Sequence, residues 1–271
     1  MNPADLMTNV VQVKPGFFKN ISEEKDVSYT RNGHELIRSS ESESFWFSHR
    51  LKIIKSIIGK FKPESIMDIG GGNGQVSEMI QNMDIAVVLL EPRAEGARNA
   101  SSAGIKTVVN STFHGAGIKD QSISAISILD VLEHIENDVE FLKECKRVLK
   151  PDGLIIITVP ALPKLFSEFD KEVGHFRRYK LNSLYKKLEE SGFHVEFGSY
   201  FFYFLPIAIF LVRFLVYPFK SKEKRRSTGH TTNKSLLGKI ISVLLKPELQ
   251  WISNLKKVPF GSSCLAIAKA S

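Results

Sequence analysis

Cysteine is nearly absent from this sequence of 271 residues, which contains only Cys145 and Cys264. The two lie far apart in apolar surroundings, so the sequence excludes a disulfide-rich secreted domain and a zinc site built on cysteines. The N-terminus has neither a basic stretch nor an uninterrupted apolar stretch, and we therefore expect no secretory signal. These absences predict a protein of the reducing cytoplasm.

Acidic residues are scarce between Tyr200 and Phe260, where 11 Lys and Arg accompany only two Glu. The rest of the chain has 26 Lys and Arg against 27 Asp and Glu, so this segment accounts for the whole formal net charge of +8. It also contains the most apolar stretch, residues 201–219, followed directly by the basic residues 220–226. Such a surplus of one sign indicates an anionic partner.

Short apolar, β-branched runs alternate with amphipathic stretches from Glu64 onward, which is typical of a parallel sheet covered by helices. The fold class predicted is therefore α/β, with a doubly wound, mostly parallel sheet of seven strands. The strands are expected at residues 65–69, 86–91, 106–109, 124–129, 154–159, 194–198 and 264–268. Helices are expected at residues 75–82, 95–103, 138–149 and 182–191.

We expect one domain made of residues 44–200 and 261–271. Residues 1–43 are polar and weakly periodic, so they are predicted to form a mobile N-terminal arm. Ser44 can cap a helix that begins at Phe45, in which apolar residues recur at helical spacing. Residues 201–260 would be a helical insertion between strands six and seven, because a hairpin connection normally has only a few residues.

The most specific motif is the glycine-rich stretch that joins the first predicted strand to the first helix, residues 68–74. Its alternating glycines allow a tight turn and a close approach of a ligand to the backbone; they are Gly70, Gly72 and Gly74. The dinucleotide pattern G-x-G-x-x-G fails in both registers, because Gln75 or Ser77 stands where the third glycine belongs. A nucleoside without a pyrophosphate fits this loop better.

The second predicted strand ends in Glu91, which places a carboxylate beside the glycine loop, where it can accept hydrogen bonds from ribose hydroxyls. Taken together, the glycine motif, Glu91 and residues 129–160 resemble the class I S-adenosylmethionine-dependent methyltransferases. The similarity is to the branch that includes the quinone-biosynthesis enzymes. The resemblance implies the strand order 3-2-1-4-5-7-6, with the last strand antiparallel. It also implies S-adenosylmethionine as the cofactor, bound by Asp68, Gly70, Gly72, Gly74, Glu91, Asn110 and Asp130. The chain departs from the family at Asn110 and Ser111, where an acidic residue often contacts the adenine.

Candidates for acceptor chemistry follow the fourth and fifth strands. Asp130, Glu133 and His134 follow the fourth, and a segment that resembles the GHxRRY motif of one methyltransferase branch, residues 174–179, follows the fifth. We predict His175 as the general base, because an imidazole titrates near neutrality and Asp170 could fix its tautomer. The alternative is that His175 only supports the loop. Asp130 and His134 are the other catalytic candidates.

The same segment supplies the predicted substrate contacts, which are Asp170, Arg177, Arg178 and Tyr179. The two guanidinium groups can hold a phosphate or carboxylate, and because adjacent residues point apart we expect one to be structural and one to face the ligand. Glu133 and His134 offer two metal ligands at most from one turn, so no metal site is expected. Trp46 and Arg50 could line a lid over the site.

The predicted function is O-methylation of a lipid-linked, glycan or quinone-like acceptor near the membrane. A transmembrane span is disfavoured because the last strand must return to the same sheet. We expect the insertion to lie on an anionic membrane surface, peripherally at its inner face, and we expect no nucleic acid partner. The alternatives are a soluble small-molecule acceptor, with the insertion as a lid or homodimer contact, and a catalytically silent scaffold.

Overall fold

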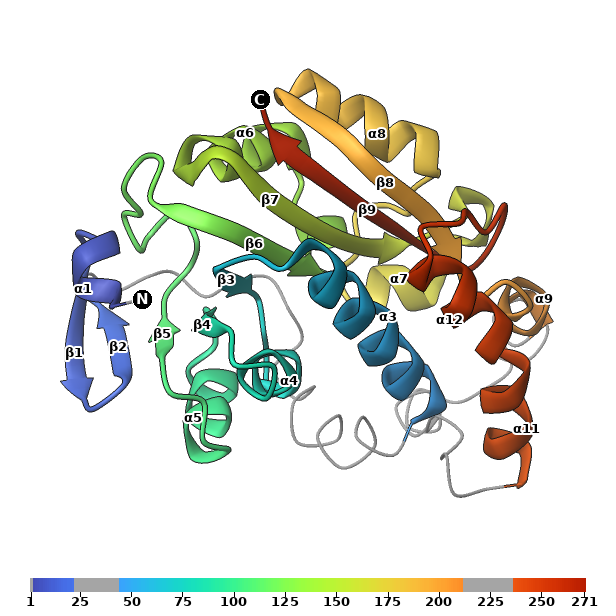
Figure 1. Ribbon diagram of the computed structural model, residues 1–271, viewed down its shortest axis with the longest axis horizontal. Helices are drawn as coiled ribbons and strands as arrows, with labels where there is room; N and C mark the ends of the chain where they lie inside the picture. Colours follow the sequence, from blue (N-terminus) through green and yellow to red (C-terminus); the bar gives the residue numbers. More distant parts are fainter. Residues whose placement is uncertain (1, 22–43, 212–235) are drawn as a thin grey trace.

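The computed structural model describes residues 2–21, 44–211 and 236–271 (Figure 1). Within these residues nine strands form one sheet, in the order β1-β2-β5-β4-β3-β6-β7-β9-β8. The strands are β1 (Val10–Lys14), β2 (Phe17–Asn20), β3 (Ser65–Ile69), β4 (Ala86–Leu90), β5 (Val108–Asn110), β6 (Ile123–Leu129), β7 (Leu149–Pro160), β8 (Phe193–Phe201) and β9 (Ser263–Ala270).

The seven strands predicted from the sequence are β3 to β9, and their order in the sheet is the expected 3-2-1-4-5-7-6. Strands β3, β4, β5, β6 and β7 are mutually parallel, whereas β9 is antiparallel to both β7 and β8. The predicted fold class is therefore confirmed. In such a sheet the carboxyl ends of the parallel strands meet at one edge, which is where ligands bind.

The N-terminal residues 2–21 are not a mobile arm, and that prediction is wrong for them. A short helix, α1 (Pro3–Leu6), precedes the β1-β2 hairpin, and β2 extends the sheet by pairing in parallel with β5. Phe17 and Phe18 are both buried, because successive side chains of a strand point to opposite faces and each ring enters a different core cluster. Residues 22–43, the rest of the predicted arm, lie outside the described residues.

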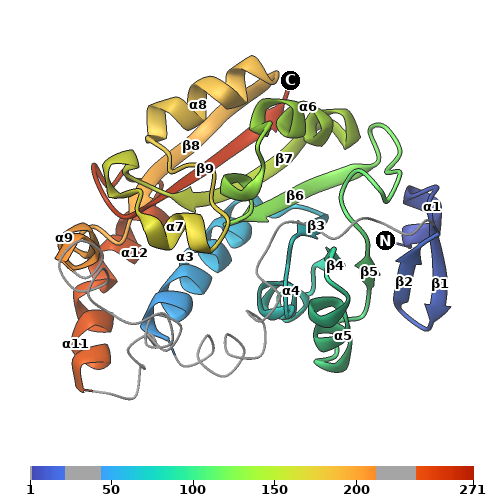
Figure 2. The same cartoon turned by 180° about the vertical axis from the view of Figure 1, so that it is seen from behind.

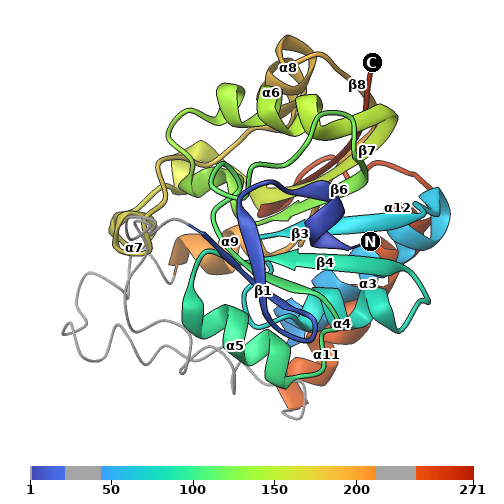
Figure 3. The same ribbon diagram turned by 90° about the vertical axis from the view of Figure 1, so that its left-hand side faces the viewer.

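Helices cover both faces of the sheet (Figure 3). Helices α6 (Asp138–Val148) and α8 (Leu181–Glu190) bury their apolar sides in the core of one face. On the other face lie α3 (Phe45–Phe61), α4 (Gln75–Gln81) and α5 (Ala94–Ser102), all within two residues of their predicted bounds. The apolar side of each helix is thus the side that packs on the sheet.

Helix α3 begins at the predicted cap, where the Ser44 hydroxyl accepts a hydrogen bond from the Trp46 amide at 3.3 Å. Its inner side is fully buried against the sheet through Ile53, Ile54, Ile57 and Ile58. Its outer side is basic and exposed, with Lys52, Lys55 and Lys60. Because α3 crosses the sheet to the edge with the carboxyl ends, its first turns reach the candidate site (Figure 1).

The predicted insertion contains α9 (Leu205–Phe210), α11 (Leu236–Leu244) and α12 (Lys246–Ser253). Helix α12 packs on α3, where the Ser253 and Ser56 hydroxyls are 2.6 Å apart, and Leu245 and Ile252 are fully buried in the same core as α3. No helix in the described part of the chain is long and apolar enough to cross a bilayer. The second half of the apolar stretch and the basic residues 220–226 lie outside the described residues.

Candidate active site

The glycine loop that follows β3 turns through three left-handed residues: Gly70 at φ 70°, Gly72 at φ 55° and Gly74 at φ 88°. An added Cβ at Gly70 would lie 2.6 Å from Val131 Cγ2, and one at Gly74 would lie 2.9 Å from Ile105 Cγ1. At Gly72 it would meet no atom of residues 2–21, 44–211 or 236–271 within 4 Å. Packing therefore requires glycine at the two ends of the loop, whereas the tip faces open space that a ligand can enter.

Asp68 lies beneath this loop rather than in it. Its carboxylate is 1% exposed and accepts hydrogen bonds from the hydroxyls of Ser127 at 2.7 Å and Ser77 at 2.8 Å. Burial raises the pKa of Asp68, and the two serine hydroxyls oppose that shift. Asp68 therefore fixes the shape of the loop from below. Its contact with the cofactor stays a prediction, because each carboxylate oxygen keeps a second lone pair.

Glu91 joins the glycine loop to the end of β4. Its two carboxylate oxygens accept from the backbone amides of Gly72 and Arg93, each at 2.9 Å. Burial raises its pKa, against the effect of these hydrogen bonds. Each oxygen keeps a second lone pair for a ribose hydroxyl. Asn110, at the end of β5, donates through Nδ2 to the carbonyls of Glu91 at 2.9 Å and Pro92 at 3.0 Å, so it supports this loop from the next strand.

Asp130 follows β6 with a left-handed φ of 57°, which turns its side chain toward the end of β7. There Oδ1 accepts from the Thr158 hydroxyl at 3.1 Å, and Oδ2 forms an ion pair with Arg50 of α3. The guanidinium of Arg50 lies over the rings of Trp46 and Phe47, 4.9 and 5.4 Å from their centroids. The sequence suggested a lid role for Arg50 but did not indicate its pairing with Asp130 or the part played by Thr158.

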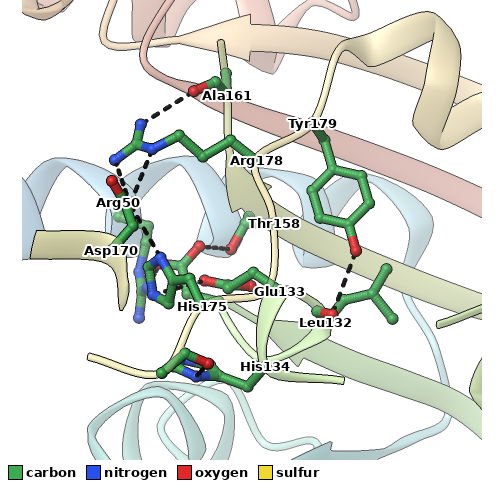
Figure 4. Close-up of polar contacts among 12 residues, drawn as sticks. Arg50, Leu132, Glu133, His134, Thr158, Ala161, Asp170, His175, Arg178 and Tyr179 are labelled. Carbon is green, nitrogen blue, oxygen red and sulfur yellow. Dashed lines mark hydrogen bonds and ion pairs between the residues drawn. The ribbon is translucent and has the colours of Figure 1, made fainter. Parts of the chain in front are cut away.

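Three residues with ligand or acid–base chemistry meet beside Asp130 (Figure 4): Glu133 and His134 on the short helix η1 (Leu132–His134), and His175 from the loop after β7. The rings of His134 and His175 are 4.6 Å apart and perpendicular, and His175 Nε2 lies 3.9 Å from Glu133 Oε1. One ligand atom from each of the three lies within 4.8 Å of the others. The fold therefore supplies a third ligand that the spacing of Glu133 and His134 did not indicate.

The electrostatics favour the neutral forms of Glu133 and His134. Burial raises the pKa of Glu133 well above its usual range, and the Asp130 carboxylate adds to this shift. Burial also lowers the pKa of His134 to about 4, with a smaller contribution from His175. Glu133 Oε2 is buried and has no hydrogen-bond partner among the residues that the structure describes. An unsatisfied buried oxygen is costly, and a bound cation or acceptor hydroxyl would satisfy it.

The loop that carries His175 is anchored by Asp170 of α7 (Glu168–Glu172). The fully buried Asp170 accepts from Arg178 Nε at 2.9 Å, from His175 Nδ1 at 3.1 Å and from the Ser167 amide at 3.0 Å. Arg178 Nη1 donates to the Ala161 carbonyl at 3.0 Å. The prediction that Asp170 and Arg178 bind substrate is therefore wrong, because they satisfy each other in the interior. The predicted contact between Asp170 and His175 is present.

Arg177 and Tyr179 point away from His175 toward Asp138. Arg177 Nη1 and the Tyr179 hydroxyl both contact Asp138 Oδ2 at 2.9 Å, and Tyr179 also donates to the Leu132 carbonyl at 3.3 Å. Tyr179 is 2% exposed, and burial together with Asp138 raises the pKa of its phenol. The predicted acceptor contact of Tyr179 is wrong, because the ring belongs to the core. Arg177 is paired with Asp138 but its side chain remains 30% exposed, so its contact with a ligand stays a prediction.

A family model described as a methyltransferase domain matches residues 43–196 of this chain. A "probable S-adenosylmethionine-dependent methyltransferase" of Mycolicibacterium smegmatis is 23% identical over 167 residues, which cover 60% of this chain and 65% of that protein. A ubiquinone biosynthesis O-methyltransferase of Xanthomonas oryzae is 25% identical over 109 residues, 38% of this chain and 46% of that one. The chain thus matches less than two thirds of the length of either relative.

Solved structures share the fold at low identity. A SAM-dependent methyltransferase from Archaeoglobus fulgidus superposes with a TM-score of 0.51 at 18% identity, over 81% of this chain and 94% of that one. The [4+2]-cyclase SpnF superposes with a TM-score of 0.52 at 14% identity, over 83% and 82%. Because a cyclase and a methyltransferase share this fold, the fold alone does not decide the reaction.

Proposed function

This chain belongs to the methyltransferase domain family, and from that premise we propose that it transfers a methyl group from S-adenosylmethionine to an oxygen of an acceptor. The cofactor would enter over the tip of the glycine loop at Gly72, with its ribose hydroxyls on Glu91. Asn110 would hold the turn at Glu91 and Pro92 beside the adenine of the cofactor. No helix N-terminus with the dinucleotide glycine pattern is needed, because this cofactor carries no phosphate.

The single observation that carries the proposal is the pair formed by Asp170 and His175 at the acceptor side of this loop. Because Nδ1 of His175 faces the Asp170 carboxylate at 3.1 Å, the proton lies on Nδ1 and Nε2 is the basic nitrogen. A positioned base of this kind, held by a carboxylate, is what removal of a hydroxyl proton requires.

The reaction balances with these groups alone. His175 Nε2 takes the proton of the acceptor hydroxyl while the oxygen attacks the methyl carbon of the sulfonium. The carbon–sulfur bond breaks, its electron pair stays on sulfur, and S-adenosylhomocysteine leaves as a neutral thioether. Asp130, whose charge is partly offset by Arg50, would stabilise the sulfonium before transfer.

The buried, unpartnered Oε2 of Glu133 favours a second interpretation of the same cluster. Glu133, His134 and His175 are the residues of the described chain that could hold a divalent ion, and one carboxylate with two imidazoles suits zinc or manganese better than magnesium. Such an ion would lower the pKa of an acceptor hydroxyl bound to it. Protein treated with a chelator to remove metal separates the two interpretations. If His175 acts as a general base without a metal, turnover is kept. The metal interpretation requires that calorimetry detect ion binding and that Glu133→Gln abolish it.

The acceptor we propose is a lipid-linked, glycan or quinone-like hydroxyl compound presented at an anionic membrane. The relatives named as ubiquinone biosynthesis O-methyltransferases support an oxygen acceptor, and the basic, apolar insertion supports a membrane location. A soluble small-molecule acceptor is the alternative. Incubation with labelled S-adenosylmethionine and separate membrane and aqueous extracts tests this, since the proposal requires label in the membrane fraction.

Calorimetry with S-adenosylhomocysteine tests the cofactor site. We expect Gly72→Arg to abolish binding, because the new side chain would occupy the open space at the loop tip. Gly104→Arg is the matched control: this glycine is also left-handed, at φ 92°, and also has no atom within 4 Å of an added Cβ, but it lies outside the loop. Intact binding by the Gly72 variant, or equal loss in both, would contradict the assignment.

A further inference from the structure

Exposed apolar side chains are concentrated on the helices that follow β8. Among the described residues, thirteen large apolar side chains are more than a third exposed, and nine of these lie between residues 207 and 260. They are Ile207, Phe210, Leu211, Ile240, Val243, Leu244, Trp251, Leu255 and Phe260. Scattered single apolar residues on a surface need no explanation, but a concentration of this kind marks a contact site.

Two of the helices are apolar on two sides. On α11, Ile240, Val243 and Leu244 are about half exposed at the i, i+3, i+4 spacing of one helix face, while Ile241 packs against the core. On α9, Ile207, Phe210 and the following Leu211 repeat the same spacing and are also exposed. A surface helix of a water-soluble domain keeps its outer face polar, whereas the outer faces of α9 and α11 expose apolar side chains.

Lysines border this apolar surface. Lys246 begins α12, Lys256 and Lys257 follow it, and all three are exposed. The neighbouring outer side of α3 adds Lys52 and Lys55. The described part of the insertion contains a single acidic residue, and that residue is buried: Glu248 is 2% exposed. Exposed apolar side chains bordered by lysines, with no exposed acidic residue in the described part of the insertion, are complementary to a partner that has negative charges at its surface and an apolar interior.

We infer that the face formed by α9, α11 and α12, bordered by the lysines of α3, docks on an anionic lipid bilayer. Apolar side chains enter the boundary of headgroups and acyl chains, and the lysines meet lipid phosphates. A protein partner fits less well, because lysine is depleted in protein interfaces. The docking surface deepens the membrane location proposed above and rests on that part of the proposed function, but it does not depend on the methyl-transfer reaction.

The docking surface lies at the same end of the molecule as the candidate active site. Helix α9 lies beside α7, which carries Asp170 (Figures 1 and 2), and α11 and α12 both contact α3, whose Arg50 pairs with Asp130 of the site. Trp46, at the start of α3, stacks on Phe202 at the end of β8 with 5.6 Å between ring centroids. Docking on these helices would therefore bring the site close to acceptors held in the membrane.

Vesicle sedimentation of the full chain tests the inference. We expect binding to vesicles of phosphatidylcholine with 30% phosphatidylglycerol at low salt, and little binding to phosphatidylcholine alone or at high salt. The double variant Ile240→Ser with Val243→Ser should bind at least tenfold more weakly. Val11→Ser with Val13→Ser is the matched control, because these β1 side chains are 51% and 54% exposed at the far edge of the sheet, and it should bind like the wild type.

The charged border is tested separately. Neutralising Lys256 and Lys257 to Gln should weaken binding by about fivefold per lysine. The control replaces Lys143 and Lys186, exposed on helices of the opposite face, and should leave binding unchanged. Thermal unfolding verifies that each variant is folded.

Three results would overturn the inference: no binding to anionic vesicles at low salt, equal binding by the variants of α11, or a dimer in solution that those variants dissolve while vesicles bind nothing. The last would assign the surface to a second copy of this chain. Binding of S-adenosylhomocysteine, measured on the same samples, reports on the proposed reaction independently, so failure of one does not imply failure of the other.

Discussion

His49 Nε2 on α3 lies 2.7 Å from Glu248 Oε1 on α12, and the pair is buried. Glu248 also accepts from the backbone amides of Phe202 at 2.9 Å and Tyr203 at 2.8 Å. One carboxylate therefore joins three parts of the chain: helix α3, the residues that directly follow β8, and the insertion. The residue after His49 is Arg50, which pairs with Asp130, so the same turn of α3 contacts both the insertion and the candidate active site.

We expect Glu248→Ala to destabilise the protein by about 3 kcal/mol, because it leaves His49 and two backbone amides unpartnered in the interior. Urea unfolding measures the change. Glu196→Ala is the control: this glutamate pairs with Lys269 at 3.5 Å on the partly exposed side of β8, and its loss should cost less than about 1 kcal/mol. Similar values for both variants would show that the buried carboxylate does not join the three parts of the chain as described.

Replacing His175 by Ala should lower the rate of methyl transfer by about 10² to 10⁴-fold while leaving the affinity for S-adenosylhomocysteine within about twofold of the wild type. Initial rates on the identified acceptor and calorimetry measure the two quantities. His194→Ala, on the exposed side of β8, is the control and should change neither. A loss of only a few fold would mean that His175 supports the loop and is not the base.

The pH dependence of stability should reveal His134. Its pKa in the folded protein is lowered to about 4, below the ~6.5 of an unfolded chain, so the unfolded state binds the additional proton between these values. The free energy of unfolding is therefore not reduced by His134 above pH ~6.5, and it decreases as the pH falls toward 4 because the unfolded state takes up the proton first. Between pH 8 and pH 4, unfolding of the wild type should show a loss of stability larger by ~2 kcal/mol or more than that of His134→Gln. Parallel pH profiles would contradict the shift.

The cofactor side of the site could be predicted from the sequence because its signals are local. Gly70, Gly72 and Gly74 are adjacent in the chain, and Glu91 ends a strand whose position follows from the alternation of apolar residues. The hairpin of residues 10–20 was missed, because one short exposed strand and the Phe17-Phe18 pair give no clear alternating pattern.

The acceptor side could be predicted only in part, because its contacts are long-range. Asp170, Arg178 and Tyr179 have the chemistry of ligand-binding residues, and no spacing rule indicates that they satisfy one another or Asp138 in the interior. The pairing of Arg50 with Asp130 joins residues 80 positions apart. The meeting of His175 with Glu133 likewise depends on how the loop after β7 folds over η1, which periodicity does not encode.

The two glycines of the loop should respond differently to the same substitution. Gly70→Ala places a methyl group 2.6 Å from Val131 Cγ2 in addition to the strain of its positive φ, so we expect a loss of ~2–4 kcal/mol. Gly72→Ala meets no neighbour and should lose only ~1 kcal/mol from strain, while weakening S-adenosylhomocysteine binding. Val131→Ala should partly rescue Gly70→Ala, because the clash is with that side chain and not with backbone. Urea unfolding of the single and double variants tests this, and equal losses at both glycines, or no rescue, would refute the packing described for the loop.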